Sequence, residues 1–579
     1  MKQASIGAAT ALVLMAFAHG AQAQTIYPIN RAEILSGASF DFKVEFPGAP
    51  AADAVKITIN GQDPAALFGK PGNFVRNEDG LDHSAYIIRG VKVTKPGAYT
   101  VEAKNGASAA KVGWEVFGNK TPKAAKNVIL FIGDGLSIAH RTAARILSKG
   151  IVEGKYGGEL AIDDMPYMAL VSTAGTDSIV TDSANSMSAY TTGHKSCVNA
   201  LGVYCARNKN TLDHPKVETL GEIAKRHGMA VGVVTNTEIE DATPAGMVAH
   251  TRRRADYNDI VRMFFDVKPD VIMGGGSPNF LAKSTPGSRR TDETDYIKAF
   301  EKDGYSFVST AAEMKAASGK ATKLLGLFNT GNVDGVLDRI QLKKGTVGRF
   351  PDQPDLTDQV RVSLDMLSKN RKGFVLMVES GRIDKYSHSL DAERAIYDTI
   401  MLDNAVRVAR DFAKKRGDTM IVVVPDHAHP VSILGTYDDA RGATPREKLG
   451  VYDEAGFPNY PVADANGYPP SVDVSRRLAL NFGSYPDWCF NAKPYLDGEN
   501  VPAVAGPERG KFVANEKYCT APGAVRIEGN LPTTSNSGVH VGDDVLLTAM
   551  GPGAAKFRGR IDNTTVFRVI AEALALGAR

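Results

Sequence analysis

The stretch NVILFIGDGLS, from Asn127 to Ser137, decides the fold. It begins with a short apolar run of the kind found in strands buried on both faces, and it breaks into Gly133-Asp134-Gly135. Similar apolar runs follow at 230–234, 271–273, 374–378, 420–424 and 545–549, with helical stretches such as Val217 to His227 and Ala392 to Lys415 between them. The pattern predicts an α/β fold, a three-layer sandwich around a mostly parallel central sheet.

Polar residues follow four of these runs. They are Asp134, the segment Asn236 to Asp241, the segment Glu379 to Asp384, and Asp426-His427. Because ligands bind beyond the carboxyl ends of parallel strands, we expect these residues to share one rim of the sheet. Carboxylates gathered there repel one another unless a counter-charge is present, and bound metal ions are the simplest resolution. Asp and His together suit zinc, whereas carboxylates with a hydroxyl suit magnesium.

Several histidines need separate interpretation, because an isolated histidine is more often a packed residue than a ligand. His388 lies one helical turn after Asp384, and His427 adjoins Asp426, so both are candidate ligands. His429 is interpreted as a packing residue or as a partner of a ligand. We predict no metal ligand at His83, His214 or His227.

The segment from Thr181 to His194 supplies a candidate nucleophile. Small residues and hydroxyls open a predicted helix, and Ser183 lies near its N-terminus. Free backbone N–H groups and a partial positive charge at that end bind phosphate. Taken alone, the stretch favours the simpler interpretation that Ser183 is an N-cap serine.

The region from Asn127 to the C-terminus resembles the alkaline phosphatases, because six segments occur in that family's order and roughly its spacing. They are Asp134-Gly135, Thr181-Asp182-Ser183-Ala184, Asp241-Ala-Thr-Pro-Ala245 with His250 and Arg254, Glu379 through Asp384-Lys385 to His388, Asp426-His427-Ala-His429, and Gly538-Val-His540. Six ordered motifs make the resemblance highly specific. It implies a secreted, metal-dependent phosphomonoesterase of the bacterial type that binds phosphate monoesters and inorganic phosphate.

The resemblance also implies roles for individual residues. Ser183 would form a phosphoserine, Arg254 would grip the phosphate as a bidentate fork, and Lys385 would reach it directly or through water. Two zinc ions and one magnesium ion per chain are implied. One zinc would be held by Asp384, His388 and His540, the other by Asp134, Asp426, His427 and Ser183, and the magnesium by Asp134, Thr243 and Glu379, with Asp241 one layer further out.

Elementary chemistry agrees with these roles. A serine hydroxyl is a weak nucleophile, and coordination to zinc stabilises its alkoxide. A planar guanidinium matches two phosphate oxygens better than an ammonium does. Among Arg252, Arg253 and Arg254, the family's spacing of four after His250 selects Arg254. Asp241 and Lys385 are the types found in bacterial members with magnesium in the third site.

Two alternatives compete with a monoesterase. Phosphodiesterases and sulfatases of the same superfamily are the nearest, but sulfatases need a C/S-x-P-x-R context that Ser183-Ala-Asn-Ser-Met187 lacks. Diesterases commonly use threonine without the matched arginine, so Ser183 together with Arg254 favours monoesters. The alternative of a different class is a metal-stabilised surface-binding protein whose N-terminal region carries the function.

The N-terminus predicts export. Lys2, an apolar run from Ile6 to Ala18 and the motif Ala21-Gln22-Ala23 are typical of a signal peptide spanning residues 1–23. No later stretch reaches the ~18 apolar residues that a membrane span needs. The 68 basic and 65 acidic side chains nearly cancel, so the charge balance does not indicate nucleic-acid binding. We expect a periplasmic or extracellular protein.

An exported chain can keep disulfides, and the four cysteines form two local couples. We predict Cys197–Cys205 and Cys489–Cys519. Four cysteines allow three connectivities, and a zinc cluster is the alternative, although the C-x7-C and C-x29-C spacings match no common zinc motif.

Three regions are expected after the signal peptide. Residues 24–120 hold short alternating strands at 39–46, 55–59, 86–93 and 98–103, which predict a small β-sandwich with no cluster of potential ligands. Residues 124–579 form the catalytic domain, and a segment of about 437–537, rich in Gly, Pro, Asn and Asp, interrupts it above the site. The resemblance implies a homodimer, which the extra domain and the insertion could block.

Overall fold

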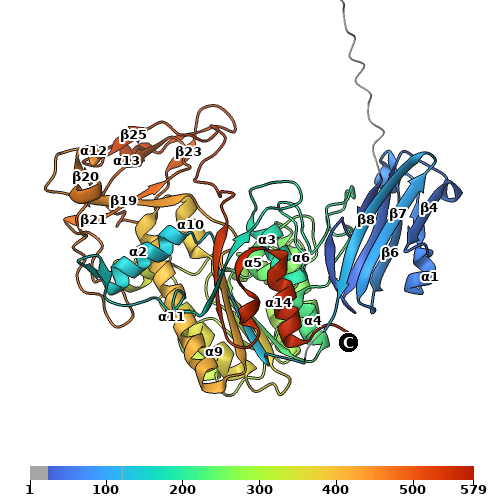
Figure 1. Ribbon diagram of the computed structural model, residues 1–579. Helices are drawn as coiled ribbons and strands as arrows, with labels where there is room; N and C mark the ends of the chain where they lie inside the picture. The colour runs from blue at the N-terminus through green and yellow to red at the C-terminus, as the bar shows by residue number, and fades with distance from the viewer. Residues whose placement is uncertain (1–23, 120–121, 579) are drawn as a thin grey trace, which may run out of the picture.

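The computed structural model describes residues 24–119 and 122–578. The predicted signal peptide, residues 1–23, lies outside the described residues. The N-terminal part forms two four-stranded sheets that pack face to face, with orders β1-β3-β6-β5 and β2-β8-β7-β4 (Figure 1). Their elements are β1 (Thr25–Tyr27), β2 (Ala32–Leu35), β3 (Ser39–Pro47), β4 (Val55–Ile59), α1 (Pro64–Phe68), β5 (Asn73–Val75), β6 (His83–Lys92), β7 (Gly97–Asn105) and β8 (Ser108–Phe117). Phe40 and Phe42 of one sheet contact Trp114 of the other, and the predicted β-sandwich is confirmed.

A ten-stranded sheet forms the centre of the remaining chain, in the order β15-β16-β14-β13-β17-β9-β18-β26-β12-β27. The strands are β9 (Asn127–Gly133), β12 (Tyr167–Ser172), β13 (Ala230–Glu238), β14 (Val271–Gly275), β15 (Ser306–Val308), β16 (Leu324–Leu327), β17 (Phe374–Ser380), β18 (Thr419–Val424), β26 (Val545–Met550) and β27 (Gly559–Asp562). Every pairing between neighbours is parallel except the two pairings of β26. The predicted mostly parallel sheet is therefore confirmed.

The direction of β26 has a simple cause. The chain reaches β26 from His540, which lies at the rim where β9, β17 and β18 end. A strand that starts at that rim must run away from it, antiparallel to its neighbour β18.

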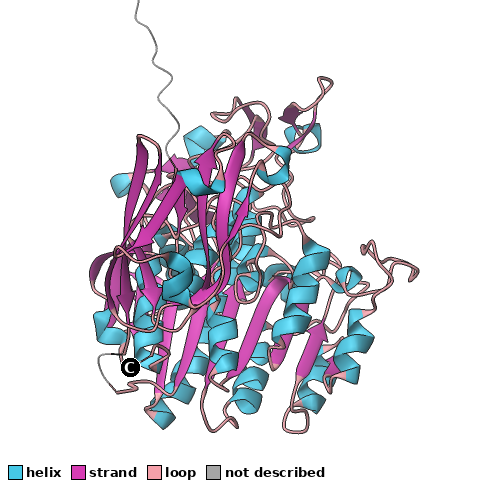
Figure 2. Cartoon of the chain, turned by 90° about the vertical axis from the view of Figure 1, so that its right-hand side faces the viewer, coloured by secondary structure: helices cyan, strands magenta, loops and turns pink. Residues whose placement is uncertain are grey.

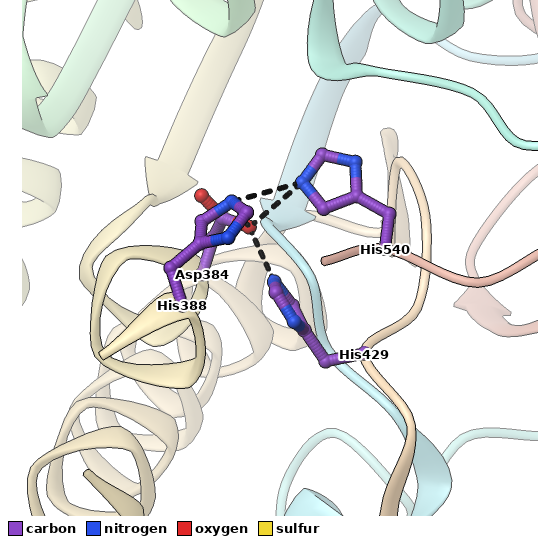
Figure 3. A group of neighbouring side chains, drawn as sticks. All are labelled: Asp384, His388, His429 and His540. Atoms are coloured by element: carbon purple, nitrogen blue, oxygen red, sulfur yellow. Dashed lines mark hydrogen bonds and ion pairs between the residues drawn. The ribbon is translucent and has the colours of Figure 1, made fainter. Parts of the chain in front are cut away.

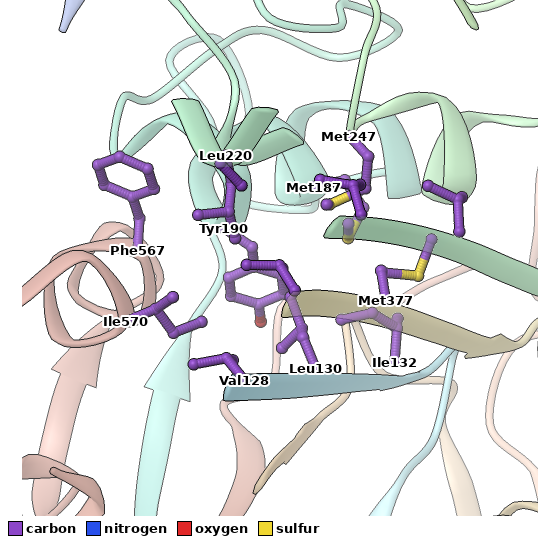
Figure 4. Close-up of a cluster of buried hydrophobic side chains, with 14 of the residues drawn as sticks. Val128, Leu130, Ile132, Met187, Tyr190, Leu220, Met247, Met377, Phe567 and Ile570 are labelled. Carbon is purple, nitrogen blue, oxygen red and sulfur yellow. The ribbon is translucent and has the colours of Figure 1, made fainter. Parts of the chain in front are cut away.

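Helices cover both faces of this sheet, which gives the predicted three layers (Figure 2). On β9, Val128, Leu130 and Ile132 face one core while Ile129 and Phe131 face the other. The first core receives α3 (Ser183–Thr192), α4 (Leu220–Arg226), α6 (Tyr257–Val267), α7 (Tyr296–Lys302) and α14 (Thr564–Leu574), and part of it is drawn in Figure 4. The second receives α2 (Ile138–Lys149), α8 (Ala311–Ala317), α9 (Leu356–Leu367) and α11 (Ala392–Arg416). Burial on both faces explains why the central strands read as continuous apolar runs.

The interrupting segment forms small sheets above one end of the catalytic unit, beside α2 and α10 (Arg382–His388) (Figure 1). Its elements are β19 (Val431–Asp438), α12 (Pro445–Lys448), β20 (Leu449–Gly450), β21 (Arg476–Phe482), β22 (Trp488–Phe490), β23 (Ala503–Ala505), β24 (Phe512–Ala514), α13 (Glu516–Cys519) and β25 (Val525–Ile527). The two predicted disulfides, Cys197–Cys205 and Cys489–Cys519, are both present. Among the described helices, none combines the length and the apolar character that crossing a membrane requires.

Candidate active site

Adjacent parallel strands bring the predicted residues to one rim. The strands β13, β17, β9 and β18 are consecutive in the sheet. Their register pairs Glu379 with Ile132 and Val424 with Ile132, so Asp134 and Asp426 emerge side by side just beyond Glu379. The remaining residues come from α3, from α5 (Ala242–Ala245), from α10 (Arg382–His388) and from the loop before β26.

The first group contains Asp134, Asp426 and His427, which are all buried. The Nε2 atom of His427 lies 3.2 Å from Asp134 Oδ1 and 3.2 Å from Asp426 Oδ2. Ser183 is the first residue of α3, and its Oγ lies 3.3 Å from the same Nε2. The N-cap of that helix is Asp182, so Ser183 is free to face this group, and an N-cap role for Ser183 is excluded.

The second group contains Asp384, His388, His540 and His429 (Figure 3). Asp384 and His388 lie one turn apart on α10, as predicted, and Asp384 Oδ1 is 3.3 Å from the Nε2 atoms of His388 and His540. The Nε2 of His429 approaches the same oxygen at 2.6 Å.

The protonation of the second group points to a cation. The Nδ1 of His388 faces the carbonyl of Gly538 at 2.6 Å, and the Nδ1 of His540 faces that of Thr181 at 2.9 Å. Each Nδ1 must therefore carry the proton, because a carbonyl only accepts. In the neutral form of both rings, the two Nε2 atoms turn lone pairs toward one another at 3.1 Å, an arrangement that a shared metal ion stabilises.

The first group gives the same indication. Among the described residues, Asp134 Oδ1 and Asp426 Oδ2 are buried without any hydrogen-bond partner. Burial, together with the nearby carboxylates of Asp384 and Asp426, raises the pKa of Asp134 well above its ordinary range. Burial and then Asp384 raise the pKa of Asp426 to about 6. The residues present in both groups therefore fit divalent metal ions.

A hydroxyl and a carboxylate lie next to the first group. Thr243 of α5 directs its Oγ1 toward Asp134 Oδ2 at 3.5 Å. Glu379 accepts hydrogen bonds from the hydroxyls of Thr235 and Thr237, and its burial raises its pKa to about 7. This is an all-oxygen set of the kind that magnesium prefers.

Two cations face the mouth of the site. Arg254 pairs with Asp241 at 2.6 Å and with Asp182 at 3.3 Å. Lys385 pairs with the other oxygen of Asp241 at 3.1 Å. Burial alone would raise the pKa of Asp241, but Lys385 and Arg254 hold it well below its ordinary value. Asp241 therefore holds the two cations close to one another, and both side chains are partly exposed.

The comparisons with known proteins agree with this geometry. A family model described as alkaline phosphatase matches residues 125–576. The chain belongs to the alkaline phosphatase family. It is therefore a phosphoric monoester hydrolase whose activity depends on metal ions.

Several alkaline phosphatases share this similarity. That of Escherichia coli (strain K12) is 34% identical over 361 residues, which cover 56% of this chain and 74% of that protein. The tissue-nonspecific isozyme of Gallus gallus is 32% identical over 494 residues, which cover 78% of this chain and 85% of that protein. The crystal structure of Thermus thermophilus alkaline phosphatase aligns with a TM-score of 0.56 and 24% identity, over 79% of this chain and 93% of that one, and supports the fold.

Sequence reasoning missed two features of this alkaline phosphatase. It left out the role of Asp182, whose Oδ2 accepts from both Arg254 and the backbone N–H of Asn199. Its position directly before Ser183 was the available signal. The prediction that the N-terminal part holds no cluster of potential ligands was wrong, because Glu45, Glu78 and His83 converge there.

The chain itself supplies a positive counter-charge to that N-terminal cluster. The ammonium of Lys43 lies 3.0 Å from Glu45 and 2.7 Å from Glu78, and its side chain is fully buried. The strands β3 and β6, which are neighbours in the sheet but not in the chain, bring Lys43 and Glu45 close to His83, and Glu78 lies in the turn before β6. No local sequence pattern reveals this contact.

Proposed function

We propose that this alkaline phosphatase hydrolyses a broad range of phosphate monoesters by transferring the phosphoryl group first to Ser183 and then to water. The observation that carries the proposal is the position of Ser183 Oγ, 3.3 Å from His427 within the group of Asp134 and Asp426, with Arg254 and Lys385 nearby. The family membership supplies the phosphomonoesterase activity, and this geometry supports serine as the acceptor.

Metal binding follows from the donor sets. We propose zinc at Asp384, His388 and His540, zinc at Asp134, Asp426, His427 and Ser183, and magnesium at Asp134, Thr243 and Glu379, with Asp241 one layer further out. When bound, these ions would lower the pKa of a coordinated hydroxyl and withdraw charge from the phosphate oxygens. A variant of the alkaline phosphatase from the Antarctic bacterium TAB5 has Mg bound in its M3 site, which supports magnesium as the third ion.

The side chains divide the chemistry among themselves. Arg254 would hold two non-bridging phosphate oxygens as a planar fork, and Lys385 would bring a second positive charge to the same oxygens. The Ser183 oxygen would attack the phosphorus in line with the departing alcohol. Because Ser183 opens α3, free N–H groups of that helix would also face the phosphate. A water molecule would then cleave the phosphoserine and regenerate the hydroxyl.

His429 is proposed as an orienting residue. Its Nε2 bonds to Asp384 at 2.6 Å, the same carboxylate that would bind zinc, and it is buried beside His540. A hydrogen-bonded partner of this kind fixes the orientation of a ligand.

Location and assembly are further parts of the proposal. The two disulfides agree with an exported protein, which we propose to be periplasmic or extracellular. We also propose a homodimer, and sedimentation equilibrium of the mature chain tests this.

One experiment separates the proposal from its alternatives. p-Nitrophenyl phosphate, its bis-ester and the corresponding sulfate are assayed before and after chelation and after restoring zinc and magnesium. We expect preference for the monoester, loss on chelation and recovery with both metals. Ser183→Ala should lose at least about a thousandfold in rate, which is about 4 kcal/mol of barrier. Preference for the bis-ester would favour a diesterase, an unchanged rate in Ser183→Ala would rule out Ser183 as the acceptor, and no turnover of any substrate would favour a binding protein.

A further inference from the structure

The N-terminal β-domain rests on one segment of the catalytic unit, residues 197–218, which we call the docking segment. The family model starts at residue 125, so it does not cover this β-domain. Figure 1 shows the β-domain beside the end of the catalytic unit that carries α3, α4 and α6. Strand β3 pairs with the docking segment through a bridge between Phe40 and Val217. The backbone N–H of Asp41 donates to Lys216, and that of Glu218 donates to Ser39, both at 2.8 Å.

Side-chain bonds extend this contact to residues 205–213 of the docking segment. Asn208 accepts from Lys43 at 2.7 Å and donates to Glu78 at 3.1 Å. Arg89 donates to the carbonyl of Asp213 at 3.0 Å. Further bonds join Glu45 to the N–H of Arg207, Asp79 to the N–H of Lys209, and the Tyr27 hydroxyl to the carbonyl of Cys205. The buried Lys43 cluster is thus part of the docking surface.

The opposite edge of the docking segment holds the phosphate-binding residues. Val203 bridges to Lys216 within the segment, and Leu201 bridges to Thr251 outside it. Three residues after Thr251, the backbone N–H of Arg254 donates to the carbonyl of Asn199 at 2.8 Å. The N–H of Asn199 in turn donates to Asp182, the carboxylate that pairs with the Arg254 guanidinium.

These pairings form one continuous ribbon. It runs from β3 to residues 216–217, then to residues 201–203, then to Thr251 and Arg254. The disulfide between Cys197 and Cys205 closes the loop that carries Asn199. Both the backbone and the guanidinium partner of Arg254 are therefore held by a segment that the β-domain covers.

We propose that the N-terminal β-domain is a positioning module for the phosphate clamp: by docking on residues 197–218 it fixes Asn199, and through Asn199 it holds Arg254 and Asp182 beside Ser183. Arg89 and Asn208 are the positioning residues that join the two parts. The inference rests on the proposed role of Arg254 as the residue that binds phosphate.

The test uses the double variant Arg89→Ala/Asn208→Ala in the full-length enzyme loaded with metal. It removes three side-chain bonds to or from the docking segment and leaves the buried ion pairs of Lys43 in place. The matched control is Arg568→Ala, because Arg568 of α14 also joins the catalytic unit to the β-domain, through Glu33 and Glu115, but away from the docking segment. The inhibition constant of inorganic phosphate, kcat, KM and zinc content are measured for each.

We expect the double variant to raise the phosphate inhibition constant and KM by about five- to tenfold, which lies within the range of coupling between neighbours in one hydrogen-bond network. The zinc content of the double variant should stay within about twofold of the wild-type value, and so should the phosphate inhibition constant and KM of the Arg568→Ala control. In an Arg254→Ala background the double variant should have no further effect on phosphate binding.

Three results would overturn the inference. The first is a folded double variant whose phosphate inhibition constant equals that of the wild type. The second is a double variant that raises this constant as much in the Arg254→Ala background as in the wild type. The third is an Arg568→Ala variant that raises the constant as much as the double variant does. If Arg254→Ala itself leaves phosphate binding unchanged, the clamp role fails first, and the inference fails with it. Circular dichroism and thermal unfolding establish that each variant is folded, and Asn208→Ala alone replaces a double variant that does not fold.

Discussion

Replacing Arg254 by alanine should weaken catalysis far more than replacing its neighbour Arg253. The Arg254 side chain is 21% exposed and is held by Asp241 at 2.6 Å and Asp182 at 3.3 Å, and we propose that its remaining donors bind the phosphate. Arg253 is 64% exposed and pairs with Asp256 instead. The pair therefore differs in orientation while sharing charge and sequence context.

The magnitude follows from the two bonds that a bidentate guanidinium makes to phosphate. Each hydrogen bond to a charged group contributes about 1.5 kcal/mol, so the loss of two costs about 3 kcal/mol, or about 150-fold in kcat/KM. Arg254→Lys retains one point charge and should lose about tenfold. Steady-state assays with p-nitrophenyl phosphate at fixed zinc and magnesium measure these ratios. A loss below tenfold in Arg254→Ala, or an equal loss in Arg253→Ala, would refute the assignment.

Three further outcomes are expected. Asp134→Ala should lower bound zinc from two ions to one and remove the magnesium, because the proposed assignment gives Asp134 to both sites. Elemental analysis that finds a single ion missing would contradict this. Chelation should lower the unfolding temperature by about 5 °C or more, because ions bound only to the folded state stabilise it, and Asp134 Oδ1 and Asp426 Oδ2 lose their partners; calorimetry with and without restored metals measures it. Burial alone would lower the pKa of His250, but the carboxylate of Glu222, 2.9 Å away, raises it. The pair of protonated His250 and Glu222 therefore stabilises the fold below about pH 6.5, and this contribution is lost as the pH rises through the raised pKa. The unfolding temperature of the wild type should therefore fall relative to that of His250→Gln as the pH rises from about 6.5. If the two unfolding temperatures change in parallel with pH, the pair contributes nothing to stability.

Much of the fold could be predicted because its signals are local. The apolar run before Asp134 indicated a strand buried on both faces, and the structure places Val128 and Ile129 in separate cores. The same logic placed Glu379 and Asp426 at one rim, since parallel neighbours end together. The separation of four residues between Asp384 and His388 predicted that they lie one helical turn apart, as they do on α10.

Other features depend on contacts between distant parts of the chain and left no such pattern. The antiparallel direction of β26 follows from where the chain leaves His540, not from the composition of the strand. The convergence of Glu45, Glu78 and His83 around Lys43 needs the pairing of β3 with β6. The ribbon from β3 to Arg254 joins four stretches of chain through three isolated bridges.

The central claim is that Ser183 accepts the phosphoryl group, and trapping tests it most directly. The enzyme is mixed with p-nitrophenyl phosphate, quenched in acid within one turnover, digested and analysed by mass spectrometry. The account predicts one phosphorylated peptide, modified at Ser183, and no modification in Ser183→Ala. Phosphate on another residue, or a Ser183→Ala variant that keeps its turnover, would contradict it.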